Sequence, residues 1–348
     1  MTLAELMSWF RIPGLSVAVI KDFQLHWAKG YGVADAETGR LVDTSTLFQA
    51  GSISKPVSAM AVLKAVQNGQ ISLDDNINKI LHSWQLPSRP LSNDPPVTPR
   101  MLASHTSGLG DGFGFPGYEP GVPLPTILQI LQGLAPSNTP VLWMERAPLS
   151  VMKYSGGGST ILQLALTDTL KRPFPEILRE LVCEPAGMTD SDFDQPLHPK
   201  RQLRAARSHD RDGPLLPRWH VYPELFAAGL WTTATDLARF ALEVQLSVHG
   251  RSNRILSRSM VQEMLNPIGV GDFAVGFRIF QHGGGWYMEH TGSTYGFSCL
   301  LLAHKLKGYG LVVMTNCNPI PEFMKEMKER VARAYDWDCL DRPVPLPH

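Results

Sequence analysis

Cysteine is scarce in this sequence and is not arranged for metal binding. The 348 residues include four cysteines, none of which forms a C-x-x-C pair or has a histidine cluster beside it. Such spacing is typical neither of a zinc site nor of a disulfide framework in a chain of this length. We therefore expect no metal site, and we expect the four thiols to be buried and inert.

Net charge and long apolar runs are lacking as well. The 32 Lys and Arg residues balance the 32 Asp and Glu residues, and no long run carries one sign. This balance argues against a nucleic acid or an anionic membrane as partner and favours a small uncharged substrate. No apolar run approaches the roughly 20 residues that a membrane-spanning helix needs.

The start of the chain lacks the basic head and unbroken apolar stretch of a signal peptide. It predicts instead a short amphipathic helix with Leu3, Leu6, Met7 and Phe10 on one side. We expect a cytoplasmic protein, although the removal of a leader would leave the same sequence.

Strand patterns occupy both ends of the chain, and helical patterns occupy its middle. A hairpin is predicted over residues 15–35, and four consecutive antiparallel strands are predicted over residues 273–316, before a closing amphipathic helix at 321–337. Apolar spacing predicts further helices at residues 57–67, 100–104, 126–134, 158–170, 175–182 and 232–245.

This order predicts a single domain over residues 1–348 with an α/β plus all-α architecture. Both chain ends would pair into one antiparallel sheet flanked by helices, formed by about residues 1–55 and 225–348. The helical patterns of about residues 56–224 would form an inserted helical subdomain. A site between the two parts is the expected arrangement.

Two S-x-x-K spacings occur, and roughly one is expected by chance in a chain of this length. Ser52 and Lys55 open the helix that is predicted at 57–67, so their side chains would share one face and meet. A lysine in an apolar site can accept a proton, and a helix start offers free N–H groups. The alternative is a capping serine beside a solvated lysine, which this stretch alone favours. Ser150 and Lys153 have no apolar helix directly after them.

Two later stretches could complete a site with Ser52. "YSGGG" begins at Tyr154 and can place a phenol at the mouth of a cleft. "EHTGSTYGF" places His290 at the end of a predicted strand, where Gly292 allows close backbone approach. Taken singly, a turn tyrosine and a plain hairpin are the favoured interpretations.

Together, the order S-x-x-K, Y-S-G and H-T-G resembles the serine hydrolases of the penicillin-binding-protein and class C β-lactamase family. The stretches "IPGLSVAVIKD", "VTPRMLASHTSGL", "LVCEPAGMTDSDF" and "AAGLWTTATDLARF" also resemble this family, and the resemblance covers the chain from about Ile12 to Asn318. It implies the β-lactamase/transpeptidase-like fold and an acyl-enzyme mechanism with no metal or cofactor.

The resemblance also implies residue roles. Ser52 would be the acylated nucleophile and Lys55 its proton acceptor, while Tyr154 would relay the proton to the leaving group. Whether Lys55 or Tyr154 is the general base stays open. The backbone N–H groups of Ser52 and Ser293 would form the oxyanion hole.

The substrate would meet Gly156, Thr291 and Gly292, and the sequence departs from the family pattern at two of the motif positions. Gly156 stands where the family usually has an asparagine that contacts a substrate acylamino group. His290 replaces the lysine of many β-lactamases, and it would make the local charge titratable near neutral pH. Its protonated form would attract a substrate carboxylate.

We therefore expect ester cleavage with weak or promiscuous β-lactam hydrolysis. The alternatives are an efficient β-lactamase or D-amino-acid peptidase, and a penicillin-binding protein that is acylated without turnover. The partner would be a small ester, β-lactam or D-amino-acid amide. Residues 109–125 and 219–226 are expected to shape the pocket, and the sequence leaves the oligomeric state open.

Overall fold

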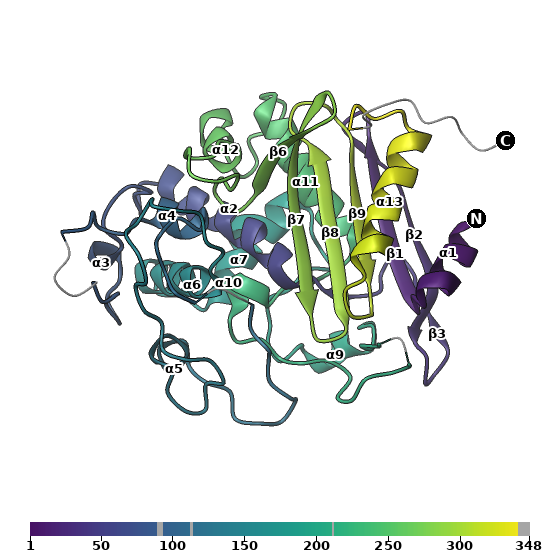
Figure 1. Cartoon of the computed structure of the whole chain (residues 1–348), viewed down its shortest axis with the longest axis horizontal. Helices are drawn as coiled ribbons and strands as arrows, with labels where there is room; N and C mark the ends of the chain where they lie inside the picture. The colour runs from purple at the N-terminus through teal and green to yellow at the C-terminus, as the bar shows by residue number, and fades with distance from the viewer. Residues whose placement is uncertain (89–92, 112–113, 211, 340–348) are drawn as a thin grey trace.

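The computed structural model describes residues 1–88, 93–111, 114–210 and 212–339. Its central element is a seven-stranded antiparallel sheet in the order β3-β2-β1-β9-β8-β7-β6 (Figure 1). The N-terminal strand β1 pairs directly with the C-terminal strand β9, which confirms the predicted sheet from both chain ends. The strands are β1 (Gly14–Lys21), β2 (Gln24–Asp35), β3 (Arg40–Leu41), β6 (Arg278–His282), β7 (Gly285–Thr294), β8 (Phe297–His304) and β9 (Gly310–Thr315).

Helices cover both faces of this sheet. Helices α1 (Leu3–Phe10) and α13 (Pro321–Ala334) lie on the face toward the viewer in Figure 1, and α11 (Ala234–Val248) lies behind it. Side chains alternate along a strand, so Leu15 and Val17 of β1 pack with the first pair of helices, while Ala18 packs with the core around α11. Because β8 and β9 are covered on both faces, their residues are buried throughout.

The middle of the chain is helical, as predicted, and lies beside the sheet (Figure 1). Helix α2 begins earlier than the predicted 57–67, and the predicted helix 175–182 is shared between α7 and a π-helical segment, Arg179–Cys183. The division of the chain at about residues 56 and 224 stays a prediction. These helices are α2 (Ser54–Gln67), α3 (Ile77–Ile80), α4 (Pro99–Ala103), α5 (Ile127–Gln132), α6 (Gly156–Leu170), α7 (Phe174–Leu178), α8 (Glu184–Ala186), α9 (Pro199–Gln202) and α10 (Leu225–Ala228).

Two smaller elements complete the fold. Helix α12 (Arg258–Leu265) was not predicted, and a two-stranded sheet joins β4 (Phe48–Gln49) to β5 (Trp231–Thr232). The second sheet fixes the chain just before Ser52 against the chain just after α10. All four cysteine side chains are buried, as expected. Among the described residues, no helix is both long and apolar enough to cross a membrane.

Asn316 ties the end of β9 to two other segments. Its buried Nδ2 lies 3.1 Å from the carbonyl oxygens of Val33, Ala34 and Arg207. Asn316→Ala would remove this side-chain donor, leaving Ala34 O with only the N–H of Arg207 at 2.8 Å, and we expect the free energy of unfolding to fall by about 2 kcal/mol. Urea denaturation measures this change. Asn253→Ala removes an exposed amide that makes no hydrogen bond within the described residues, and it should change stability by less than about 0.5 kcal/mol. Equal losses in the two variants would contradict the role of Asn316.

Candidate active site

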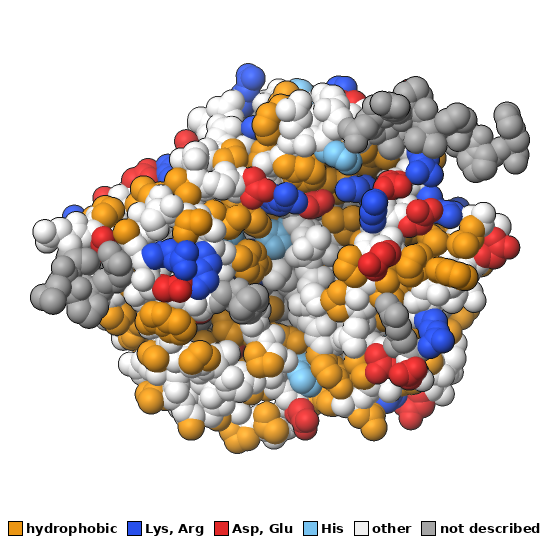
Figure 2. Space-filling view, in the orientation of Figure 1, with side chains coloured by type: hydrophobic (Ala, Val, Ile, Leu, Met, Phe, Trp, Pro, Cys, Tyr) orange, Lys and Arg blue, Asp and Glu red, His pale blue; other side chains and the backbone are white. Residues whose placement is uncertain are grey.

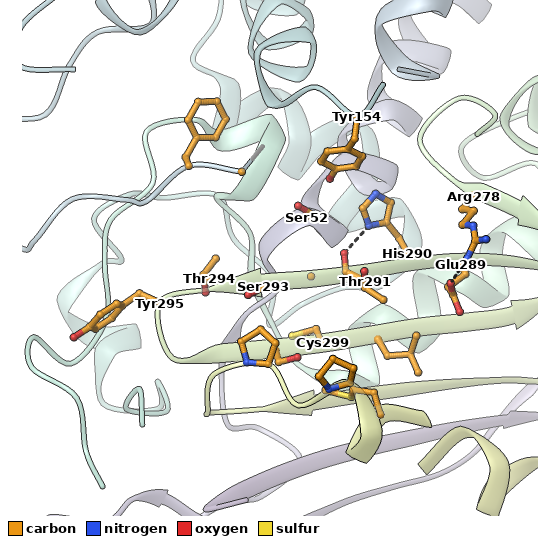
Figure 3. Close-up of a pocket in the computed structure, with 18 of the residues that line it drawn as sticks. Ser52, Tyr154, Arg278, Glu289, His290, Thr291, Ser293, Thr294, Tyr295 and Cys299 are labelled. Carbon is orange, nitrogen blue, oxygen red and sulfur yellow. Dashed lines mark hydrogen bonds and ion pairs between the residues drawn. The ribbon is translucent and has the colours of Figure 1, made fainter. Parts of the chain in front are cut away.

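A cavity of about 930 Å³ lies between the sheet and the helical part of the chain. On the face shown in Figure 2, the surface is hollowed between these two parts. Strand β6 pairs with β7 only from Gly285 to Glu289, so the rest of β7 offers a free edge to the cavity. Figure 3 shows the lining side chains, which include those of Ser52, Tyr154, His290, Thr291 and Ser293, with Gly292 between them.

Ser52 lies in the 3₁₀ segment η1 (Gly51–Ile53), directly before α2. Lys55 is 2% exposed, and its Nζ lies 3.1 Å from Ser52 Oγ and 2.9 Å from the carbonyl oxygen of Ala227. Spacing of three residues at a helix start brings the two side chains onto one face. The predicted pair therefore meets, and the α10 carbonyl that holds the lysine could not be read from the sequence.

The turn that carries Ser52 is pressed against β7. Gly51 has a φ of +52°, and a Cβ there would lie 2.6 Å from Ser293 N. A Cβ on Gly292 would lie 1.9 Å from the Ala50 carbonyl oxygen and 3.3 Å from Ser52 N. Only glycine fits at both positions, because a side chain would separate the two backbones. The predicted oxyanion-hole residues, Ser52 and Ser293, thus lie on neighbouring segments that both line the cavity.

The ring of Tyr154 is held by aromatic neighbours, and its hydroxyl points toward Ser52 in Figure 3. The centroid of the Tyr154 ring lies 4.2 Å from that of His105 and 6.0 Å from that of Phe273. Lys55 Nζ lies 4.9 Å from the Tyr154 centroid. The hydroxyl is buried and has no hydrogen-bond partner within the described part of the chain. It is therefore available to a bound molecule.

His105 lies in the turn that directly follows α4. It has a φ of +60° and is 2% exposed, and its Nδ1 accepts a hydrogen bond from Ser155 N at 3.2 Å. The ring thereby supports both the backbone and the side chain of the Tyr154 segment. Burial, followed by repulsion from Lys55 and His290, holds the pKa of His105 well below its ordinary value.

His290 differs from the sequence expectation in its charge. Its ring is 5% exposed, and Nδ1 lies 2.7 Å from the Thr291 carbonyl oxygen, to which it can donate. Burial, with a smaller contribution from the charge of Lys55, lowers the pKa of His290 to about 3. The expected titration near neutral pH is therefore wrong: His290 is neutral in that range and presents Nε2 as an acceptor rather than a cation that attracts a carboxylate.

Gly156 and the second S-x-x-K, Ser150 and Lys153, are not part of the cavity lining. Gly156 is buried in the first turn of α6, where its carbonyl oxygen accepts a hydrogen bond from Thr160 Oγ1 at 3.2 Å. In the second S-x-x-K, Ser150 Oγ donates to the carbonyl oxygen of Ala147, whereas Lys153 Nζ donates to that of Gly110. Ser150 and Lys153 thus have separate partners.

The rim of the cavity comes partly from the two stretches that were expected to shape it. Phe115 and Pro116 belong to the first stretch and Tyr222 to the second, while residues 112–113 lie outside the described part. Phe273 and Tyr295 add aromatic surface that the sequence did not indicate. No group of three His, Cys, Asp or Glu side chains suited to a metal ion occurs among the described residues.

Comparisons with known proteins agree with this geometry. The family model described as Beta-lactamase matches residues 2–336. Protein flp of Staphylococcus aureus (strain N315) is 20% identical over 336 residues, covering 92% of this chain, and the chain spans only 63% of that relative's length. Esterase EstB of Burkholderia gladioli is 30% identical over 197 residues, which cover 53% of this chain and 47% of EstB.

Solved structures show the same fold. The octameric penicillin-binding protein homologue from Pyrococcus abyssi matches with a TM-score of 0.79 and 22% identity, covering 97% of this chain and 76% of that one. A class C β-lactamase from Rhodobacter sphaeroides matches with a TM-score of 0.74 and 19% identity, covering 95% and 97%. These matches confirm the predicted β-lactamase/transpeptidase-like architecture.

The neutral state of His290 predicts a pH dependence of stability. The unfolded chain takes up a proton on this histidine near pH 6.5, while the folded chain does so only near pH 3. The free energy of unfolding should therefore fall as the pH drops below 6.5, by up to about 1.4 kcal/mol per pH unit from this residue. Urea denaturation of the wild type and of His290→Gln between pH 7 and 5 measures the effect. Parallel curves for the two proteins would contradict a neutral His290.

Proposed function

Because this chain belongs to the β-lactamase family, whose members are serine hydrolases, we propose that it cleaves small esters through an acyl-enzyme on Ser52. The observation that carries the proposal is the 3.1 Å contact between Ser52 Oγ and the buried Nζ of Lys55, at the edge of a large cavity. A hydroxyl beside an amine in a desolvated site is the arrangement that activates a serine nucleophile.

The proposed reaction has two halves. Ser52 Oγ attacks the ester carbonyl carbon while its proton passes to Lys55 in its neutral form, or through Tyr154, and the leaving oxygen receives a proton from the Tyr154 hydroxyl. The oxyanion lies between the N–H groups of Ser52 and Ser293. Water then attacks the acyl-enzyme with the same groups in reverse order, releasing the acid and restoring Ser52.

The proposed preference for esters starts from the missing side chain at Gly156, which lies two residues after the cavity residue Tyr154 and itself contributes nothing to the lining. An asparagine amide there could donate to an acylamino group, as β-lactams and peptides require, whereas glycine cannot. The similarity to an esterase over about half of the chain supports the same preference. Efficient β-lactam or D-amino-acid amide hydrolysis is the second candidate, supported by the fold shared with a class C β-lactamase. A protein that is acylated without turnover would instead release one equivalent of product and stop.

The neutral His290 extends the preference to uncharged substrates. Neither it nor His105 carries charge near neutral pH, so neither ring offers a cation to a substrate carboxylate. We propose a small neutral ester as the partner. A cytoplasmic location stays a prediction.

Labelling with a fluorophosphonate tests the nucleophile. We expect a single adduct on the peptide that contains Ser52, and loss of at least about 1,000-fold in ester hydrolysis for Ser52→Ala, because the nucleophile cannot be replaced. Ser150→Ala is the matched control and should retain wild-type activity, since the Ser150 hydroxyl is bonded to the Ala147 carbonyl. An adduct on the Ser150 peptide, or an active Ser52→Ala protein, would overturn the proposal.

Gly156→Asn tests the substrate preference. The residue is helical, so an asparagine fits its backbone. The ratio of cephalosporin to short-chain ester hydrolysis should rise by up to about tenfold, as expected for one added hydrogen bond of roughly 1 kcal/mol. Gly156→Ala adds a side chain without an amide and should leave the ratio unchanged. Steady-state kinetics on both substrates give the answer, and an unchanged ratio in a folded Gly156→Asn protein would contradict the role of this position.

A further inference from the structure

Tyr154 owes its position to the turn that precedes α6. Its hydroxyl has no hydrogen-bond partner within the described residues, so it is not anchored at its tip. The aromatic contacts restrain the ring plane, but the distance of the hydroxyl from Ser52 is set by the backbone at its base. Small displacements of a catalytic group have large effects, because a shift of about 1 Å can lower a rate by about 100-fold.

One carboxylate from a distant loop holds this turn. Asp111 Oδ1 accepts a hydrogen bond from Ser155 Oγ at 2.6 Å, and Asp111 Oδ2 accepts one from Gly157 N. Ser155 Oγ in turn accepts from Gly158 N at 2.8 Å and caps the helix. Asp111 therefore binds Ser155 and Gly157, the first and third residues after Tyr154, while His105 accepts from the N–H of Ser155.

The local sequence is adapted to this contact. A Cβ on Gly157 would lie 2.8 Å from Asp111 Oδ2 and 2.4 Å from Leu142 Cδ1, so glycine lets the carboxylate approach the backbone. Lys153 Nζ donates to the carbonyl oxygen of Gly110 at 2.9 Å and so holds the loop that carries Asp111. Lys153, the lysine of the second S-x-x-K, is thus hydrogen-bonded to the residue that precedes Asp111.

Opposing electrostatic effects act on the Asp111 side chain. Asp111 lies at the N-terminus of a 15-residue helix, where negative charge is stabilised by the helix dipole. Burial raises the pKa of Asp111, against the hydrogen bonds from Ser155 and Gly157 and the charge of Lys153. The two hydrogen bonds that Asp111 accepts, from Ser155 Oγ and Gly157 N, are what fixes the turn.

We infer that Asp111 is a positioning residue that aims the Tyr154 hydroxyl at the leaving group. This inference rests on the proposed function, because it assigns Asp111 to the step in which Tyr154 delivers a proton. Asp111 touches no reacting atom, and its effect reaches the reaction only through the turn. It should therefore matter most for substrates whose leaving group needs that proton.

Two esters with the same acyl group test whether Asp111 affects proton delivery by Tyr154. A p-nitrophenolate leaves without a proton, whereas an ethoxide must be protonated as it departs. The kcat/KM ratio of p-nitrophenyl butyrate to ethyl butyrate is therefore a measure of proton delivery, and it does not depend on how much of the protein is active. In Asp111→Asn and Asp111→Ala the ratio should rise by about tenfold, a part of the roughly 100- to 10,000-fold that a placed general acid contributes.

Two further variants serve as controls. Glu145→Gln removes a nearby carboxylate that pairs with Lys153 but does not contact the turn after Tyr154, and it should leave the ratio unchanged. Ser155→Ala keeps Asp111 but removes the hydroxyl that joins it to the turn, and it should raise the ratio in the same direction. It provides the measurement should the Asp111 variants fail to fold.

Tyr154→Phe completes the experiment. Its ratio should already be high, and adding Asp111→Asn should change it by less than about twofold. The inference is overturned if Asp111→Asn lowers both rates equally, which would make Asp111 only structural, or if it moves the ratio equally with and without the Tyr154 hydroxyl. An active Ser52→Ala protein would instead refute the proposed function, so the two failures are distinguishable.

Discussion

The site depends on one close approach between backbones. Gly51 and Gly292 come from segments about 240 residues apart, and neither position has space for a Cβ. The approach is possible because β1 pairs with β9, which carries β8 and β7 into place beside the start of α2. The second sheet, β4 with β5, fixes the same turn from the other side. Removing either glycine would move the proposed nucleophile away from the proposed oxyanion hole.

Desolvation then decides which groups carry charge. Lys55, His105 and His290 are all buried around the Tyr154 ring, and three cations so close together would repel each other strongly in a medium of low dielectric constant. Both histidines avoid this by staying neutral, as their lowered pKa values indicate. A second lysine at position 290 would have to share the site with Lys55. The histidine keeps the hydrogen-bonding capacity without adding a second buried charge.

Local physics made part of this site predictable from the sequence. Spacing of three at a helix start placed Ser52 beside Lys55, and period-two patterns placed His290 on a strand of the correct sheet. At Ser150 and Lys153 the same spacing does not open a helix, and the two side chains have separate partners. The contacts of Asp111 and of the Ala227 carbonyl could not be predicted, because each joins segments that are distant in the sequence. The charge of His290 was mispredicted for the same reason: its burial comes from other segments.

Both aromatic and charged side chains line the cavity. Phe115, Tyr222 and Phe273 contribute aromatic surface, Lys325 and Lys328 of α13 contribute positive charge, and Arg278 and Glu289 meet where β6 pairs with β7. There Arg278 pairs with Glu289 at 3.5 Å, as Figure 3 shows, and also with Asp272 at 2.6 Å, so its charge is balanced. A substrate carboxylate would find no excess positive charge from this arginine and would meet two carboxylates beside it. The aromatic side chains offer apolar surface to an acyl chain, which supports small esters on grounds that are independent of Gly156.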